Sequence, residues 1–465
     1  MLDFILNILA TPAMLVGLLS MVGLILQKKP VEDVIKGTIK TIVGFLVLSA
    51  GAGVIQTESL NAFGELFNWT FNMTGTVPNN EAIVAMALTK FGLDTSYIMV
   101  IGLILNIVLA RFSKMHYIFL TGHHSLYMAC MLAVLLGPLG GLSGFTLWLA
   151  GGCLLAFISA FSPWFLHSSM EKIVETDELG FGHFGGFGYW VAAQCGKLFK
   201  GSRSTEELNF PQRLTFLRDT TVSIGITMVV FFLVVTAVAV GKGILKEDPA
   251  QFANLAELMG AGDTKTHWAV WAIKRGLNFA GAVYIILSGV RLIVGELVPA
   301  FKGIAEKLVP GAVPAIDCPV VFPYAPNAVL IGFLVSFLGG VVGLIVLIAL
   351  NNAGIGLALI LPGVVPHFFC GASAGVFGNA EGGLKGCVLG SFVHGLIITF
   401  LPALCMPVFD ALDKGSTFSD ADFSWMALVF GNLAKVVKGI PLLIICVVVF
   451  ALPMVLSGFK NGQEK

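Results

Sequence analysis

The chain has 465 residues, of which 57% are hydrophobic and only 12% are charged. Soluble globular proteins carry about 25% charged residues, so this composition excludes a soluble enzyme. The 27 basic residues are balanced by 27 acidic residues, and the sequence therefore offers no basic surface for a nucleic acid. A mean hydropathy of +0.91, with repeated apolar runs of about 20 residues, predicts an all-α polytopic membrane protein in contact with membrane lipids.

Eleven apolar runs follow one another along the chain, and most are long enough to cross a bilayer. They are residues 5–27, 37–55, 96–112, 117–139, 141–166, 220–241, 266–290, 325–350, 354–370, 384–403 and 424–457. Glycine and proline shorten or interrupt the runs at 354–370 and 384–403, which predicts broken helices or re-entrant hairpins there. The first run has no basic segment before it, so we interpret it as a retained span and not as a signal peptide.

Lysine and arginine are distributed unevenly between the loops that join these runs. They follow the first, third and fifth runs, and the segment 168–219 after the fifth run holds six of them. Residues 57–88 and 137–143, after the second and fourth runs, contain none. Because cytoplasmic loops are enriched in these residues, the pattern predicts an outer N-terminus, a cytoplasmic C-terminus and a cytoplasmic segment 168–219.

An internal repeat indicates two halves inserted in opposite directions. Shifting the chain by 238 residues superposes Gly51, Ile55, Glu58, Ala62 and Phe63 on Gly289, Ile293, Glu296, Ala300 and Phe301. A second similar pair, 181–183 and 377–379, also lies late in each half, although at a different offset. Five runs separate the copies, and an odd number inverts the second copy. We therefore predict inverted repeats at 1–219 and 220–423, a final span with its tail at 424–465, and a substrate site between the repeats.

Polar side chains inside apolar runs are costly in a bilayer and are functional candidates for that reason. In the fourth run, Gly122 can interrupt a helix and leave His123, Ser125 and Tyr127 as donors and acceptors for a polyol or a lactone. The alternative is a pair formed by His123 and His124 that backbone carbonyls satisfy at a helix end. The first interpretation places part of a ligand site at the start of this run.

A glycine-rich stretch at 180–188 surrounds His183 and Phe184. It contains a formal GxGxxG pattern, but a chain of this composition offers no βαβ unit that would make the pattern a nucleotide site. Dense glycine lets a backbone approach a small ligand closely. We therefore expect a tight hairpin tip that carries His183, with a flexible loop as the alternative.

Two proline-bounded polar segments, 76–81 and 312–319, occupy equivalent positions in the repeat. They predict paired hairpin tips near the membrane centre, with Asn79 aligned to Asp317. Three roles are open for Asp317: an acceptor for substrate hydroxyls, a proton site, or a solvated loop residue. Glu58 and Glu296, another aligned pair, are expected to have a scaffold role.

The sequence shows no known catalytic constellation. It has no Walker A lysine loop, no HExxH, no GxSxG and no carboxylate pair with a water-activating partner, so we predict neither catalytic residues nor a metal or other cofactor. The eight cysteines lie mostly inside apolar runs without CxxC spacing, which predicts buried thiols and disfavours both a disulfide framework and a metal centre.

Five blocks of sequence resemble one known family. They are IKGTIKTIVGFL at 35–46, LTGH at 120–123, GH at 182–183, LVPGAVPAIDC at 308–318 and YAPNAV at 324–329. They resemble the membrane-embedded IIC (permease) subunit of the bacterial ascorbate phosphotransferase system, in the ascorbate/galactitol superfamily. The blocks occur in both halves, so the resemblance covers nearly the whole chain.

The resemblance implies a homodimer of eleven-span protomers in the bacterial inner membrane. Each protomer would have a core domain that carries the substrate by an elevator movement and a V-shaped domain that holds the dimer together. The substrate implied is L-ascorbate, which a cytoplasmic IIB subunit phosphorylates from a phosphocysteine, the phosphate having come through a IIA subunit.

The same resemblance implies a set of substrate-binding residues. Carried over by motif, they are Asn80, Glu81, His123, His124, Ser125, Leu126, Tyr127, His183, Phe184 and Asp317. Tyr127 and Phe184 stand where the family pattern has glutamine, and residues 79–81 align only with a gap. Two other functions stay open: a IIC for a related polyol or sugar acid such as galactitol, and an ion-coupled secondary transporter in which Asp317 or Glu81 carries the proton.

Overall fold

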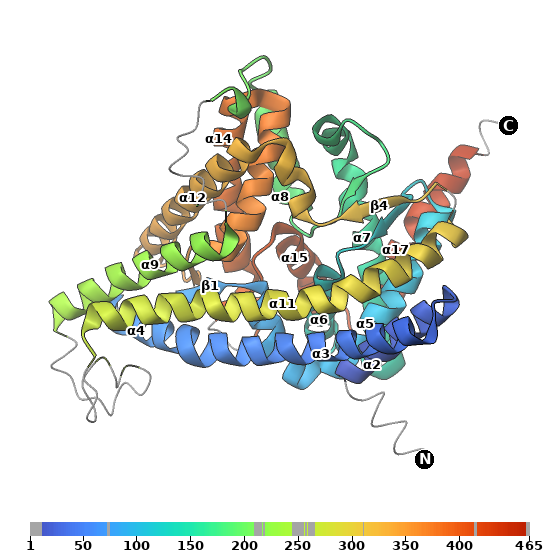
Figure 1. Ribbon diagram of the computed structural model, residues 1–465, viewed down its shortest axis with the longest axis horizontal. Helices are drawn as coiled ribbons and strands as arrows, with labels where there is room; N and C mark the ends of the chain where they lie inside the picture. The colour runs from blue at the N-terminus through green and yellow to red at the C-terminus, as the bar shows by residue number, and fades with distance from the viewer. Residues whose placement is uncertain are drawn as a thin grey trace.

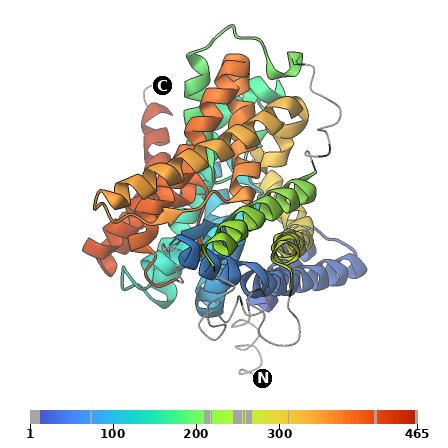
Figure 2. The same ribbon diagram turned by 90° about the vertical axis from the view of Figure 1, so that its left-hand side faces the viewer.

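The computed structural model describes residues 12–461 apart from 72–74, 209–215, 217–218, 244–254, 256–257, 259–265, 310 and 413–415. The fold is mostly helical. Its helices are α2 (Pro12–Leu26), α3 (Val31–Ile55), α4 (Asn61–Phe71), α5 (Asn80–Phe112), α6 (Gly122–Leu136), α7 (Gly144–Val174), α8 (Gly186–Lys197), α9 (Thr220–Lys242), α11 (Trp268–Leu308), α12 (Pro326–Asn352), α13 (Val364–Pro366), α14 (Ala372–Cys405), α15 (Ala421–Met426), α16 (Asn432–Val436) and α17 (Ile440–Asn461). Figures 1 and 2 show α3 and α11 packed along each other on one side of the molecule, with α12 and α14 on the other.

Six helices of the described residues are long and apolar enough to cross a membrane. They are Asn80–Phe112, Gly144–Val174, Ile224–Lys242, Pro326–Asn352, His367–Val408 and Ile440–Ser457. The multi-pass membrane architecture is therefore confirmed, whereas the count of eleven spans stays a prediction. The helix of the third predicted run begins at Asn80 and not at position 96. Asn79 fixes this start, because its side chain accepts a hydrogen bond from Ala82 N–H at 2.7 Å and caps α5.

The last three predicted runs differ from the helices that form. Residues 354–370 contain a short strand and then join α14 through a π-helical turn at His367–Gly371, so this run is broken as expected. The run at 384–403 is the second part of α14, which kinks at Gly382 and Gly383. The run at 424–457 is wrong as one span: α16 ends at Val436, Gly439 adopts a positive φ of 62°, and α17 starts afresh.

The segment 168–219 is less of a loop than the sequence predicted. Helix α7 continues to Val174, and α8 forms from Gly186 to Lys197. Helix α8 packs closely on α14. The backbone of Gly196 in α8 leaves no room for a side chain at Gly382 in α14. Of the glycines that suggested a hairpin tip, Gly186 and Gly188 lie in α8, where a side chain would meet Ser162 and His394. The cytoplasmic location of this segment stays a prediction.

Among the described residues, six short strands, which the all-α prediction omitted, form two parallel three-stranded sheets. One sheet has the order β5-β1-β6, built from β5 (Leu359–Ile360), β1 (Gly75–Pro78) and β6 (Ser416–Thr417). The other has the order β2-β4-β3, built from β2 (Tyr117–Phe119), β4 (Val313–Ile316) and β3 (Gly180–Phe181). Each central strand therefore pairs only with strands from the opposite half of the chain.

The pairing of each central strand with strands of the other half follows the 238-residue offset found in the sequence. The central strands β1 and β4 begin 238 residues apart, at Gly75 and Val313. The second similarity, between 181–183 and 377–379, has no such counterpart, because the first lies at β3 and the second lies inside α14. That part of the repeat assignment is wrong, and β6 is the strand that occupies the position of β3 in the other sheet.

Two ion pairs join the halves in the same reciprocal way. Glu58 Oε2 lies 3.1 Å from Arg275 Nη1, and Glu296 Oε1 lies 2.9 Å from Lys40 Nζ. The second pair fits because Gly37 has no side chain to displace the Glu296 carboxylate. Both carboxylates therefore fasten α3 and the turn that follows it to α11, which agrees with the scaffold role expected of them.

The centre of the protein is α6. Every residue of this helix except His123 is buried, and the helix is packed between α5 and α7. All eight cysteines lie in the described part of the chain; they are free, and seven are buried, which confirms the prediction of buried thiols. A helix buried on all sides fixes its first turn firmly, and that turn carries the histidines described next.

Candidate functional site

Each predicted polar segment follows the C-terminal end of a short strand. Asn80 and Glu81 begin α5 after β1, His123 lies in the first turn of α6 after β2, His183 follows β3, and Asp317 follows β4. The three strands of the β2-β4-β3 sheet are parallel, so their C-terminal ends share one edge of the sheet. That edge brings His123, His183 and Asp317 together from three distant parts of the chain.

The distances at this edge place Asp317 between two imidazoles. His123 Nε2 lies 3.5 Å from Asp317 Oδ2, and the two side chains are 16% and 31% exposed. A ring nitrogen of His183 lies within 4.8 Å of an Asp317 carboxylate oxygen and of the Cys318 sulfur. Asp317 Oδ1 accepts a hydrogen bond from Cys318 N–H at 2.7 Å. One oxygen of this carboxylate is therefore bonded to the backbone, and the other lies next to His123.

The matching edge of the β5-β1-β6 sheet presents amide groups. Asn79 uses its oxygen to cap α5, and its Nδ2 atom has no hydrogen-bond partner among the described residues. Asn80 Oδ1 accepts from Ser419 N–H at 2.9 Å, which ties the start of α5 to the segment after β6. The side-chain oxygens of both asparagines thus accept hydrogen bonds from backbone N–H groups.

Asp420, three residues after β6, connects the two edges. Its Oδ2 atom lies 3.9 Å from His124 Nε2 and 3.9 Å from His183 Nδ1. Its Oδ1 atom accepts a hydrogen bond from the Ser419 hydroxyl at 2.6 Å. Its charge also acts on Glu81, as does that of Asp317. We call this set the polar cluster; it consists of Glu81, His123, His124, His183, Asp317 and Asp420.

Sequence reasoning missed Asp420 because that search covered polar residues inside apolar runs. Asp420 lies between the runs ending at 403 and starting at 424, in a stretch that looks like a solvated loop. The structure buries it to 2% exposure. The repeat carried a usable signal, since β3 and β6 occupy equivalent places in the two sheets, and the residues after β6 could have been compared with His183.

Two predicted site residues have polar atoms with unused bonding capacity. The Tyr127 hydroxyl and His123 Nδ1 are buried and have no hydrogen-bond partner among the described residues. The two rings lie 5.7 Å apart. Buried polar groups are almost always paired in proteins, so these atoms are available to a ligand.

Three other predicted residues serve packing and local helix structure. The Ser125 hydroxyl donates to the Thr121 carbonyl at 3.4 Å, and Leu126 belongs to the main hydrophobic core. The Phe184 ring is fully buried and stacks on Phe119 at a centroid distance of 4.4 Å. Their part in substrate binding stays a prediction.

A known protein family matches most of the chain. The family described as "PTS system sugar-specific permease component" matches residues 7–422, which is most of the chain. The chain belongs to this family. It is therefore a permease subunit of a phosphotransferase system (PTS), a transport component for which other subunits carry out phosphoryl transfer.

A curated relative narrows the type of permease. The "Ascorbate-specific PTS system EIIC component" of Mycoplasma pneumoniae (strain ATCC 29342 / M129 / Subtype 1) is 28% identical over 467 residues. The match covers 92% of this chain and 70% of the relative. Together with the family, it identifies this permease as an ascorbate/galactitol-type IIC component.

Some spacings in the polar cluster of this permease resemble those of a metal site. His124, His183 and Asp420 have ligand atoms within 4.8 Å of one another, as do His123, His124 and Asp317. However, His124 Nδ1 accepts a hydrogen bond from Phe184 N–H at 3.2 Å. The proton of a neutral His124 ring must then lie on Nε2, where it points at Asp420. A ring with both nitrogens engaged has no lone pair for a metal, so His124 fits a hydrogen-bonding role better.

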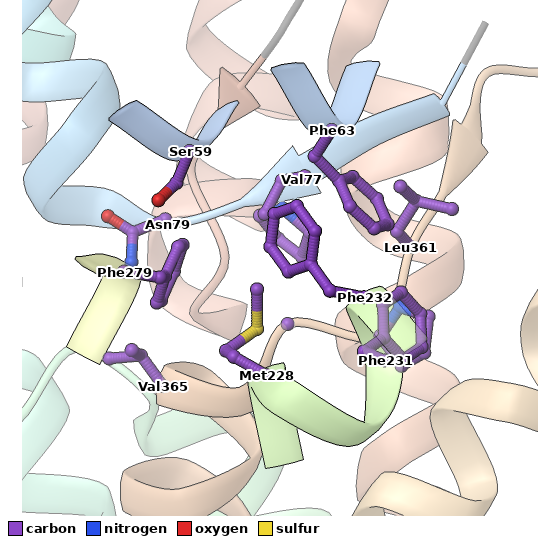
Figure 3. Close-up of a pocket in the computed structure, with 13 residues that line it drawn as sticks. Ser59, Phe63, Val77, Asn79, Met228, Phe231, Phe232, Phe279, Leu361 and Val365 are labelled. Carbon is purple, nitrogen blue, oxygen red and sulfur yellow. The ribbon is translucent and has the colours of Figure 1, made fainter. Parts of the chain in front are cut away.

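An apolar void lies beside the β5-β1-β6 sheet of the permease, and Asn79 forms part of its wall (Figure 3). Phe63, Phe231, Phe232 and Phe279 line it from α4, α9 and α11, opposite strand β1. A water-sized sphere fits in only about 20 Å³ of this void. The void is too apolar and too narrow for a polyhydroxy compound, and the polar cluster is the better candidate site.

Proposed function

We propose that this permease binds L-ascorbate at the polar cluster and delivers it to a separate cytoplasmic IIB subunit, whose phosphocysteine has been charged through IIA. Ascorbate is a lactone with several hydroxyl and enol groups, so it needs donors and acceptors on several sides. The imidazole N–H groups of His123 and His183 would donate hydrogen bonds to its ring oxygens, and the carboxylates of Asp317 and Asp420 would accept hydrogen bonds from its hydroxyls.

One observation supports this proposal more than the others: five chain segments from both halves contribute ionisable side chains to one cluster. The nearest alternative substrate is a galactitol-like polyol, since family membership is compatible with both. Binding competition between labelled ascorbate and galactitol would decide between them. The proposal fails if galactitol displaces ascorbate at lower concentration than unlabelled ascorbate does.

Transport is proposed to follow from the two halves, 1–219 and 220–423, being inverted repeats. The reciprocal strand exchange and the reciprocal ion pairs support this relationship. Repeats of this kind place a substrate site at their interface and permit alternating access. The proposal includes an elevator movement of a core domain against a V-shaped domain, a final span with tail at 424–465, and a homodimer in the bacterial inner membrane.

The orientation proposed here, with an outer N-terminus and a cytoplasmic segment 168–219, can be tested by chemical labelling. Lys200 is exposed, and Cys195 is the one native cysteine that is not buried. A Lys200→Cys variant in a Cys195→Ser background should react with membrane-impermeant maleimide in inside-out vesicles only. The Cys195→Ser protein alone is the matched control, and labelling of intact cells would reverse the topology.

The decisive test of function is reconstitution with the partner subunits. Purified permease in vesicles, supplied with IIA, IIB, the general phosphotransferase proteins and phosphoenolpyruvate, should convert labelled ascorbate to ascorbate phosphate. Omitting IIB should abolish the product. Formation of galactitol phosphate and no ascorbate phosphate would replace the substrate assignment with its alternative.

A further inference from the structure

Tyr189, on α8 behind the polar cluster, is not among the residues that the sequence indicated. Its hydroxyl lies 2.7 Å from His183 Nδ1, and the residue is completely buried. The ring is held on three sides, by Phe181 at 5.3 Å, Phe377 at 5.7 Å and His394 at 5.9 Å between ring centroids. A phenol confined in this way can hold its partner in one orientation.

The chemistry of the contact determines where the proton of His183 lies. Within the described part of the chain, His183 Nδ1 is the nitrogen or oxygen atom to which the Tyr189 hydroxyl is bonded. A buried phenol needs an acceptor for its O–H group, and the sulfur of the neighbouring Cys370 is a weak one. The hydroxyl therefore donates to Nδ1, and a neutral His183 carries its own proton on Nε2.

We propose that Tyr189 is a positioning residue, which fixes the ring orientation and tautomer of His183 so that Nε2–H is presented as a donor to the ligand. This inference rests on the proposed function, since it assigns a role at the same site. The Nδ1 side of the ring is occupied by Tyr189 and Asp420, so Nε2 is the nitrogen that the protein leaves for a substrate oxygen.

The arrangement differs from that of the neighbouring His124 in what fixes the ring. His124 receives its Nδ1 hydrogen bond from the backbone N–H of Phe184, which no side-chain substitution removes. His183 depends on one side-chain hydroxyl. Removing that hydroxyl should therefore release His183 while leaving His124 as it is.

The test is a Tyr189→Phe variant, which keeps the ring and loses only the hydroxyl. We expect ascorbate binding to weaken about 3- to 10-fold, the range for one lost hydrogen bond. The ring-nitrogen NMR shifts of isotopically labelled His183, assigned with a His183→Ala variant, should change from one tautomer to a mixture. Tyr97→Phe is the matched control, because Tyr97, in α5, stacks on Trp148 of α7 with 4.1 Å between the ring centroids. This substitution should leave both readouts unchanged.

A double-mutant cycle separates positioning from general stability. If Tyr189 acts through His183, adding Tyr189→Phe to His183→Ala should weaken binding no further. An equal loss in both backgrounds, or unchanged His183 shifts in Tyr189→Phe, would overturn the proposal. Shifts that change in a protein that binds no ascorbate would instead refute the proposed substrate and leave the positioning role standing.

Discussion

The two sheets of this permease have the same construction but use their edges differently. At the β2-β4-β3 edge, His123, His183 and Asp317 keep atoms that the backbone does not use. At the β5-β1-β6 edge, the oxygens of Asn79 and Asn80 are bonded to backbone N–H groups. Two sheets of the same construction thus carry polar groups with free atoms mainly at one edge and structural caps at the other. Glu81 and Asp420 are exceptions, since both come from the capped edge and belong to the polar cluster, where Asp420 lies near His124 and His183.

The largest expected effect comes from the ligand-facing edge. Asp317→Asn and His123→Ala should each weaken ascorbate binding by at least about 10-fold, or roughly 1.4 kcal/mol, because each removes one partner of the 3.5 Å pair. Equilibrium binding to purified protein measures this. Asp410→Asn and His267→Ala, both at exposed positions, are matched controls. Unchanged binding in both site variants would remove this edge from the substrate site.

A smaller loss is expected at the residue that bridges the edges. Asp420→Asn keeps the size of the side chain but removes the charge that lies 3.9 Å from two imidazoles. Ascorbate binding should weaken by about 3- to 10-fold, as expected for one weakened hydrogen-bonding group. Isothermal titration would measure it. Wild-type affinity in this variant would show that Asp420 is part of the scaffold and not of the site.

The capped edge should respond in stability more than in binding. Asn79→Ala removes the N-cap of α5 and should lower the free energy of unfolding by about 1 kcal/mol. Asn79→Ser keeps a capping oxygen and should restore most of the loss. Thermal unfolding in detergent compares the two. Equal melting temperatures for the alanine and serine variants would show that the cap contributes nothing.

The sequence predicted much of this framework where the signal was long or repeated. The offset of 238 residues anticipated the equivalence of β1 and β4, which overlap the polar segments at 76–81 and 312–319. The strands themselves were missed because two to four residues are too few to show a period of two. Helix α8 was missed because Gly185, Gly186 and Gly188 suggested a turn, whereas close packing on neighbouring segments requires Gly186 and Gly188 to lack side chains.

The structure brings together three residues that chemistry and a motif had both indicated, although their part in substrate binding stays a prediction. His123, His183 and Asp317 were singled out from the residues alone, and the structure places them together. Tyr189 required three-dimensional information, because it is a buried partner of His183 and nothing in its local sequence distinguishes it. For Asp420, the internal repeat was the one signal in the sequence, since its local sequence looks like a solvated loop. The hydrogen bonds of Asn80 and His124 are likewise set by segments distant in the chain.

In the function proposed here, this subunit supplies binding and access, while trapping depends on phosphate added by IIB. A carrier that binds ascorbate equally from both faces can only equilibrate it. The permease alone in liposomes should therefore bind ascorbate but accumulate none under an imposed proton or sodium gradient. With IIA, charged IIB and phosphoenolpyruvate inside, it should accumulate ascorbate phosphate, and replacing the IIB phosphocysteine should abolish this without changing the binding constant. Concentrative uptake of ascorbate by the lone protein, driven by either ion, would contradict the account and establish a secondary transporter.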